Sequence, residues 1–565
     1  MECPTSSGEP HNSPINNTTI GTLPPHTPES ESTDVAMSDA SSRTEHNPAE
    51  RLALDNLMSG LSTLVRPEDA KSYLKTVYED ITPTVPDREH RPGVSMFLLQ
   101  WRKTSPSFGM STWTGNEVYF APLWKRPDII RAEDLSRYGS DIQAINWALL
   151  GQSKSNARAA RKELYFYRNR SRTALPPHTP YALSTEPFFQ FHLMNTQPKP
   201  VVEHFQLRNT LARTSHVDLF YAGTHEVLRT DLHGSMTARV LDLTSSSNPR
   251  QKATHFRITT LAAKDNVLLA GGFHGDYALL NLHSCSPTPI RGMISQAKNA
   301  ITNHAHFFAD RQSGQTQLYI ASNDHHLRTL DCTTATVLNI HGPHPVVNCA
   351  ATSPDSRLRV LVGDFPGSSI IDANTGSLVT LLPSSSRDAF ACAWSDNGIH
   401  VATAAQDNRV FVWDARRWDV PLAIMPTELD CVRVLRFSPL AGGWPVLVAA
   451  EAADYVHVLD AVSFGERQVL EFFGNVAGVA FDETGAELVV ANGDAGFGGL
   501  MSWRRCGGRN LAQPMELFAT EEEGERKGSM RWDSPRRMVS EQWMGSVERT
   551  ERMRGPLKEC EDLFI

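Results

Sequence analysis

The most constraining feature of this chain is the stretch from residue 401 to 416, which reads VATAAQDNRVFVWDAR. Its first part alternates side chains as a half-buried strand does, and it runs into the polar turn Gln406-Asp407-Asn408. A second strand follows and ends on the dipeptide Trp413-Asp414. Two short strands joined by a tight turn predict an antiparallel hairpin.

Four residues of this hairpin are candidates for a structural motif: Thr403, Asp407, Trp413 and Asp414. A buried tryptophan needs an acceptor for its indole N–H. We therefore expect Trp413 to hydrogen-bond across the strands, with Thr403 and Asp407 in the same polar group.

The ending of this hairpin recurs along the chain. The positions equivalent to Asp414 lie 41 to 50 residues apart, and they are Asp231, Asn281, Asp331, Asp372, Asp414, Asp460 and Arg504. An alternating apolar strand precedes most of them, and a further strand precedes that one. A period of about 40 to 45 residues is typical of propeller blades. Since residues 200–505 hold no long helical window, the pattern predicts an all-β fold, a seven-bladed β-propeller at about 200–510, with six or eight blades as alternatives.

Several stretches outside the strand pattern resemble a family of WD-repeat (WD40) proteins found in fungi and plants. They are residues 138–143, 204–209, 263–266, 269–273, 299–303 and 472–481. The resemblance covers about residues 135–505 and implies the propeller fold; because the family is largely uncharacterised, it implies no catalytic residue. The chain departs from it at the extra glycines of Gly493–Gly499. Only one blade keeps the Trp-Asp pair, so we expect apolar packing to hold most blades together.

Composition limits the classes of partner and compartment. The net charge of −9 argues against a nucleic-acid-coated surface, and no apolar run approaches the length of a membrane span. The start lacks the basic and apolar regions of a secretory signal. The eight cysteines form no C-x-x-C pair and are expected to be reduced apolar fillers: Cys3, Cys285, Cys332, Cys349, Cys392, Cys431, Cys506 and Cys560. These features predict a cytoplasmic or nuclear protein.

Three regions flank the expected propeller. We expect a disordered tail at 1–47, a helical and aromatic-rich region at 48–199 that packs on the propeller, and a charged tail at 511–565. Apolar periodicity predicts a helical hairpin at 49–81. The aromatic segment at 90–150 is expected to wrap the propeller or to donate a strand, for which 117–120 is the best candidate.

A basic segment with interleaved aromatic residues spans 153–172. Such a pattern is used by sites for single-stranded nucleic acid. We prefer a solvated helix face with its aromatic residues turned inward, because the rest of the chain is acidic.

No stretch of the sequence carries a specific catalytic or cofactor motif, so we expect no enzyme, no cofactor and no catalytic residue. Six histidines cluster in sequence, namely His304, His306, His325, His326, His341 and His344. A metal site would need three or four of them to converge. Surface or turn histidines are the preferred interpretation, and no metal is expected.

The favoured function is a non-enzymatic scaffold for protein partners of unknown identity. The alternative is a substrate receptor of a cullin-4 ubiquitin ligase, since residues 401–416 resemble the sixteen-residue box of such receptors. By that resemblance Arg416, in the sequence WDAR at 413–416, would face the ligase adaptor.

Overall fold

The computed structural model describes residues 126–138, 141–147, 153–168, 182–234, 237–244, 256–284, 288–297, 299–383 and 388–507. All of them belong to one compact unit of the chain, Glu68–Ile565. The predicted tail at 1–47, hairpin at 49–81, strand at 117–120 and tail at 511–565 lie outside these residues.

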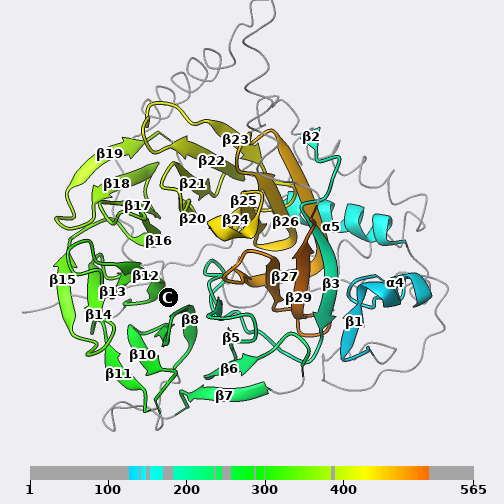
Figure 1. Cartoon of the computed structure of the whole chain (residues 1–565), viewed down its shortest axis with the longest axis horizontal. Coiled ribbons are helices and arrows are strands. Elements are labelled where there is room, and N and C mark those ends of the chain that lie inside the picture. Colours follow the sequence, from blue (N-terminus) through cyan, green and yellow to red (C-terminus); the bar gives the residue numbers. More distant parts are fainter. Residues whose placement is uncertain are drawn as a thin grey trace, which may run out of the picture. The chain divides into compact units, whose positions relative to one another are not determined.

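Five four-stranded antiparallel sheets follow one another along the chain, and within each the strands pair in sequence order (Figure 1). The first contains β4 (Leu211–Arg213), β5 (Leu219–Ala222), β6 (Glu226–Thr230) and β7 (Thr237–Asp242). The second contains β8 (Ile258–Lys264), β9 (Val267–Gly272), β10 (Asp276–Asn281) and β11 (Ile290–Met293). The third contains β12 (Thr302–Ala309), β13 (Thr316–Ser322), β14 (Leu327–Asp331) and β15 (Val337–His341). The fourth contains β16 (Val347–Thr352), β17 (Leu358–Gly363), β18 (Ser368–Asp372) and β19 (Leu378–Leu382). The fifth contains β20 (Ala389–Trp394), β21 (His400–Ala405), β22 (Arg409–Asp414) and β23 (Ala423–Pro426).

A nine-stranded sheet completes the arrangement and combines strands from both ends of the described chain. Its strands from the later part are β24 (Val432–Phe437), β25 (Val446–Glu451), β26 (Ala453–Asp460), β27 (Glu466–Phe481), β28 (Glu487–Asn492) and β29 (Gly499–Arg505). Its strands from the earlier part are β1 (Ile129–Arg131), β2 (Ala182–Leu183) and β3 (Phe189–Asn195). The short helices are α4 (Ala132–Tyr138), α5 (Lys154–Arg168) and the 3-10 turn η1 (Leu440–Gly442).

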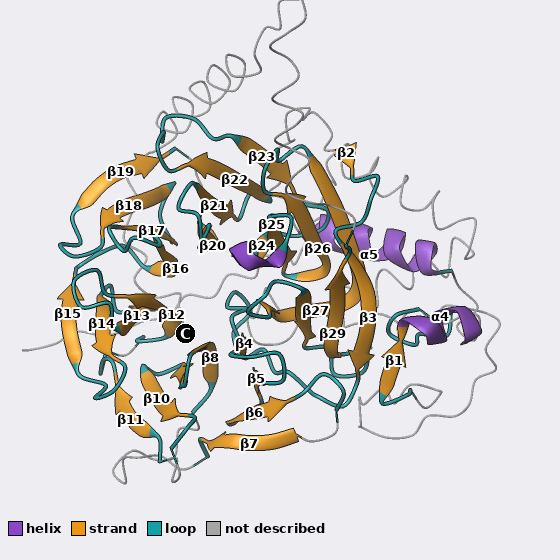
Figure 2. Ribbon diagram, in the orientation of Figure 1, coloured by secondary structure: helices purple, strands orange, loops and turns teal. Residues whose placement is uncertain are grey.

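The sheets are set around a common centre with their first strands innermost (Figure 2). These inner strands pack in sequence as neighbours, β4 against β8, β12, β16, β20, β24 and β27 in turn, and β27 then contacts β4. The chain therefore forms a closed β-propeller, which confirms the predicted fold class. The nine-stranded sheet contains two four-stranded arrangements joined through β27, and the count of seven blades stays a prediction.

Closure joins segments that lie far apart in sequence. β3 pairs antiparallel with β29, with Met194 opposite Met501, and β1 adds a further strand beyond β3. Residues before 200, which the sequence-based boundary places in the N-terminal region, thus contribute three strands, β1, β2 and β3, to the nine-stranded sheet. The boundaries at 47, 199 and 510 otherwise stay predictions.

The recurring positions equivalent to Asp414 lie at the end of the third strand of the sheets. β10, β14, β18, β22 and β26 end at these positions, and Asp231 directly follows β6. The reason for an acidic residue there is a turn: the Asp331 carboxylate accepts the backbone N–H groups of Thr333 and Thr334, both at 2.7 Å. Asp372 makes the same bonds to Asn374 and Thr375. Side chains that bond their own downstream backbone favour such turns.

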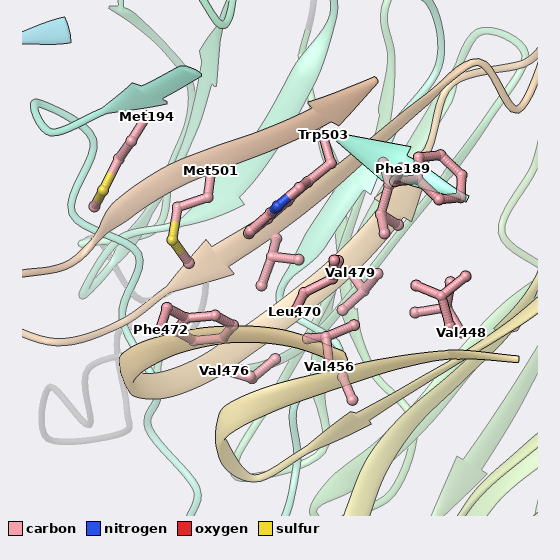
Figure 3. Close-up of a cluster of buried hydrophobic side chains, with 14 of the residues drawn as sticks. Phe189, Met194, Val448, Val456, Leu470, Phe472, Val476, Val479, Met501 and Trp503 are labelled. Atoms are coloured by element: carbon pink, nitrogen blue, oxygen red, sulfur yellow. The ribbon is translucent and has the colours of Figure 1, made fainter. Parts of the chain in front are cut away.

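Apolar side chains fill the space between neighbouring sheets. A buried cluster lies at each junction around the ring, from the β4 and β8 sheets to the junction between the last sheet and the β4 sheet. Figure 3 shows the cluster within the nine-stranded sheet, where Phe189 and Met194 of β3 lie near Phe472, Val479 and Trp503. Removing apolar surface from water contributes about 25 cal/mol per Å2, so the burial of these clusters stabilises each junction. None of the described helices is long and apolar enough to cross a membrane.

Candidate functional site

Six of the seven inner strands contain a β-bulge, which lies near the start of the strand in all of them but β27. Ladder register shifts there in six strands, at Thr259, Asn303, Asn348, Phe390, Arg433 and Ala477. A bulge leaves one residue out of the ladder and re-aims its side chain. These residues therefore face along the ring rather than into their own sheet.

The re-aimed side chains link each sheet to the next. Asn303 Nδ2 donates to the carbonyl of Val347 at 3.0 Å, and Asn348 Nδ2 donates to the carbonyl of Ala389 at 3.2 Å. Thr259 Oγ1 donates to the carbonyl of Thr302 at 2.7 Å. Thr210, which precedes β4 and is not a bulged residue, links the first sheet to the last by donating to the carbonyl of Ala477 at 2.9 Å.

One junction of this series uses a different interaction. The guanidinium of Arg433 lies 3.7 Å from the ring centroid of Phe390, a cation–π contact between neighbouring inner strands. We call the end of the channel where the inner strands begin the channel mouth, and the polar and cation–π contacts that join neighbouring sheets there the girdle.

A cavity of about 20 Å³ lies inside this girdle. Its wall includes Arg208, Asn209, His304, Cys349, Cys392 and Arg436. No aspartate or glutamate is among the described residues that line it. By volume it holds a group of about the size of one water molecule.

Arg436 places a partly buried guanidinium at this cavity. Its Nη2 donates to Asn209 Oδ1 at 2.6 Å across the channel. Burial lowers the pKa of Arg436. The nearby Cys349 and Cys392 side chains raise it, but by less than burial lowers it. A buried cation without a carboxylate favours an anion or a thiolate beside it.

An aromatic surface adjoins the cavity on the segment before β4. The His204 ring stacks on Phe205, with centroids 4.8 Å apart, and lies 5.8 Å from the ring of Phe273. The Arg257 guanidinium lies 4.5 Å from the Phe273 centroid and donates from Nε to Glu203 at 2.7 Å. Phe205 and Phe273 are both partly exposed. Aromatic and arginine side chains dominate the energetics of protein interfaces.

The structural motif predicted from the sequence lies in the fifth sheet, away from this mouth. Trp413 is fully buried, and its Nε1 donates to Thr403 Oγ1 at 3.2 Å. Asp407 lies in the turn between β21 and β22, 3.8 Å from Arg409. Asp414 ends β22 and accepts the backbone N–H of Arg416 at 2.9 Å.

Arg416 is held by the same carboxylate. Its Nε and Nη2 donate to the two oxygens of Asp414, at 2.9 and 2.7 Å, and its side chain is 73% exposed. The guanidinium therefore lies at the surface in a fixed orientation. Its partner-binding role stays a prediction.

The six clustered histidines do not converge. Within the described part of the chain no group of three potential ligands could hold a metal ion. His304 and His306 lie in strand β12 and are not the surface or turn residues that the sequence predicts. Burial, His304 and two arginines place the pKa of His306 well below its ordinary value, and the His306 ring bonds Thr352 at 2.7 Å.

The basic segment that begins at residue 153 forms α5, whose central arginines point into the protein. Arg158 and Arg161 are buried and both pair with Asp454 of β26. Arg158 Nη2 also donates to the carbonyl of Phe472 at 2.8 Å. The solvated-face interpretation is wrong for these two residues, because their charges are satisfied inside the protein; Tyr165 does face inward as predicted.

The N-terminal stretch at 141–147 covers the bend of β27. Gln143 donates to the carbonyl of Phe473 at 2.7 Å and accepts the N–H of Phe473 at 2.6 Å. Gly474 follows at φ +129°, and a side chain there would collide with Asn492. Arg126 reaches the glycine-rich turn after β28 and donates to the carbonyl of Gly496 at 2.7 Å. Two of the stretches that carry the family resemblance thus meet here.

The bulged residues were missed by sequence reasoning, although a signal exists. They recur every 42 to 45 residues from Thr259 to Ala477, in the same period as the strand ends. Their chemistry varies from threonine and asparagine to phenylalanine and arginine, so no motif search finds them.

Comparison with known proteins gives distant relatives. No model of a known protein family matches the chain. An uncharacterised protein of Schizosaccharomyces pombe is 24% identical over 256 residues, which are 42% of this chain and 72% of that protein. The ribosome biogenesis protein YTM1 of Chaetomium globosum is 33% identical over 187 residues. This match spans 32% of the chain and only 34% of YTM1.

Solved structures with a similar arrangement include the Dos1 propeller, at 16% identity and a TM-score of 0.42, covering 56% of this chain and 85% of that one. A chain from the mitotic checkpoint complex has 13% identity and a TM-score of 0.46, covering 59% of this chain and 98% of that one. With its closed ring of four-stranded sheets and its Trp-Asp strand end, the chain is a WD40-type β-propeller protein, and the curated relatives named here are fungal.

Proposed function

We propose that this protein is a non-enzymatic scaffold that binds protein partners at the channel mouth. The observation that carries the proposal is the aromatic surface of His204, Phe205 and Phe273 with Arg257, beside a cavity without carboxylates. Rigid aromatic side chains and arginines supply much binding energy for little conformational entropy. The segments that carry these residues adjoin strands β4, β8 and β9, and the Arg257–Glu203 ion pair holds two of them together, so a partner meets a preorganised surface.

A competing surface lies on the outer edge of the ring. The outermost strands β15 and β19 expose apolar side chains, including Leu338 and Leu378. Exposed apolar edge strands also attract partners. The two surfaces are separable by mutation.

Affinity purification with mass spectrometry tests the proposal. The full chain is compared with a Phe205→Ala/Phe273→Ala variant and with a matched Leu338→Ala/Leu378→Ala variant, each checked for an unchanged melting temperature. We expect partners to be lost with the mouth variant and kept with the edge variant, because truncation of a central hot spot costs at least about 2 kcal/mol, more than tenfold in affinity. The reverse pattern would assign binding to the edge and contradict the proposal. The likeness to YTM1 makes ribosome-assembly factors a class of partner to look for.

The cullin-4 receptor function is a second proposal and depends on Arg416. The exposure of this side chain and its fixed orientation on Asp414 favour recognition by a partner with an acidic or carbonyl-rich surface. In the same purification, Arg416→Ala should remove the cullin-4 adaptor and leave the melting temperature unchanged. Absence of that adaptor from the wild-type sample would refute this function and leave the first proposal intact.

A further inference from the structure

Two thiols line the channel cavity side by side. Cys349 of β16 and Cys392 of β20 are both buried, and Cys349 Sγ lies 3.8 Å from the carbonyl oxygen of Cys392. The Cys392 thiol donates to the carbonyl of Val360 on β17, at 3.9 Å, and both cysteines line the same cavity. The two residues belong to the innermost strands of neighbouring sheets, and inner strands β16 and β20 are in contact.

The surroundings of Cys349 are cationic. His304 and Arg436 line the same cavity as Cys349. No carboxylate is among the described residues of the wall. Reactive cysteines are found in electropositive sites of this kind, because the thiolate is the nucleophile. The side chains of Cys392 and His304 outweigh burial and hold the pKa of Cys349 well below its ordinary value.

Other described cysteines have different surroundings. Burial and the Asp331 carboxylate raise the pKa of Cys332 to about 12, and burial raises the pKa of Cys506. Cys431 is buried with its sulfur 3.5 Å from the Asp430 carboxylate. Cys431 is therefore a matched internal control, a buried thiol beside an anion rather than a cation.

We infer that Cys349 and Cys392 form a peroxide-reactive dithiol, which oxidises to a disulfide that joins β16 to β20 at the channel mouth. The size of the cavity, about 20 Å³, selects the oxidant. It holds a group of about the size of one water molecule, which suits hydrogen peroxide and excludes glutathione disulfide. This chemistry goes beyond the scaffold function and does not depend on it.

The reaction balances in two steps. The Cys349 thiolate attacks one oxygen of hydrogen peroxide, so that an S–O bond forms, the O–O bond breaks, and hydroxide leaves and takes up a proton as water. The Cys392 sulfur then attacks the sulfur of the sulfenic acid; an S–S bond forms, the S–O bond breaks, and a second water leaves with the Cys392 proton. Two thiols are oxidised, and one peroxide is reduced to two waters.

Site-resolved mass spectrometry of the full chain tests the inference. The reduced protein is treated with hydrogen peroxide, and the tryptic peptides of Cys349, Cys392 and Cys431 are followed with time. We expect a peptide cross-linked between Cys349 and Cys392, while Cys431 stays reduced. A Cys349 that oxidises as slowly as Cys431, or that pairs with any other cysteine, would overturn the inference.

Variants separate the roles of the two thiols and of the cation. Cys392→Ser should leave a sulfenic acid on Cys349, which dimedone traps when the oxidised chain is unfolded in its presence, whereas Cys349→Ser should leave Cys392 unreacted. Arg436→Gln should slow oxidation of Cys349 by hydrogen peroxide several-fold and shift the pH profile of that oxidation upward, and Arg436→Lys should restore both. Unchanged rates and profiles in a folded Arg436→Gln chain would contradict the role of the cation. Glutathione disulfide should give no mixed disulfide at Cys349, and rapid glutathionylation would refute the size selection.

Discussion

Arg161 and Asp454 form an ion pair in which neither side chain has any exposed surface. Arg161 Nη2 lies 3.0 Å from Asp454 Oδ1, and the second carboxylate oxygen also contacts Arg158 at 3.1 Å. The N–H of Gly474 donates to the same carboxylate at 2.7 Å. Burial alone would lower the pKa of Arg161, but the Asp454 charge raises it above its ordinary value. Helix α5 is thereby fastened to strand β26 and to the bend of β27.

Replacing Arg161 by methionine should destabilise the protein by about 3 kcal/mol, at the lower end of the range for breaking a buried pair. The cost arises because Asp454 keeps a buried charge that Arg158 alone neutralises incompletely. Urea denaturation monitored by tryptophan fluorescence measures the change in the free energy of unfolding.

Lys162→Met, in the same helix, is the matched control. Lys162 pairs with Glu428 at 3.0 Å, but both side chains are partly exposed to water. Surface pairs contribute about 0–1 kcal/mol. Equal losses of stability in the two variants would show that α5 is held by helix packing rather than by the buried charge.

The bond from Trp413 to Thr403 should be measurable by a double-mutant cycle. Trp413→Ala removes a fully buried ring and should cost about 3–5 kcal/mol. Thr403→Val keeps the shape but leaves the indole N–H without an acceptor, at a cost of about 1–3 kcal/mol. In a Trp413→Phe background the same threonine change should be nearly neutral. Additive costs in thermal or urea unfolding would mean that the two side chains do not interact.

Local patterns explain what could be predicted from the sequence. Asp331 and Asp372 bond the backbone only two or three residues downstream, so the strand ends carry their own signal in the chain. The hairpin of Thr403 and Trp413 is equally local, since the two bonded residues are ten positions apart in sequence. Apolar alternation then follows from each strand having a buried face.

Long-range relationships explain what could not be predicted. Arg161 and Asp454 are 293 residues apart, and nothing near Arg161 distinguishes a buried arginine from a solvated one. The pairing of β3 with β29 likewise joins the two ends of the described chain. Arg436 and Asn209, which meet across the channel, become neighbours only when the ring closes.

Asp414 should make stability depend on pH at the acidic end. The hydrogen bonds from Arg416 lower its pKa from 3.8 to about 2. Because the folded pKa lies below the unfolded one, the contribution to stability is present above about pH 4 and is lost as the pH falls toward 2. We expect less than about 1 kcal/mol, since water screens this surface pair.

Urea denaturation between about pH 5 and pH 2 measures the effect. Asp414→Asn should show a shallower loss of stability with acid than the wild type, and Arg416→Gln should shift the loss to higher pH. Identical pH profiles for all three chains would contradict the predicted pKa of Asp414.

Closure of the ring predicts different outcomes for two N-terminal truncations. A chain that begins at Arg126 keeps β1, α5 and β3, and it should fold with a melting temperature close to that of the full chain. A chain that begins at Pro200 loses β3, which pairs with β29 and buries Phe189, Leu193 and Met194. Each such side chain contributes about 1.5–3 kcal/mol, so the loss approaches the whole stability of a typical protein, about 5–15 kcal/mol.

We therefore expect the shorter chain to aggregate or to lose cooperative unfolding in calorimetry, with an open edge at β29. A synthetic peptide of residues 182–200 should restore part of its stability by pairing with that edge, and a peptide with Leu193 and Met194 replaced by aspartate should not. Cooperative unfolding of the chain that begins at Pro200, at the melting temperature of the longer chain, would show that β3 is dispensable and that the ring closes within residues 200–507.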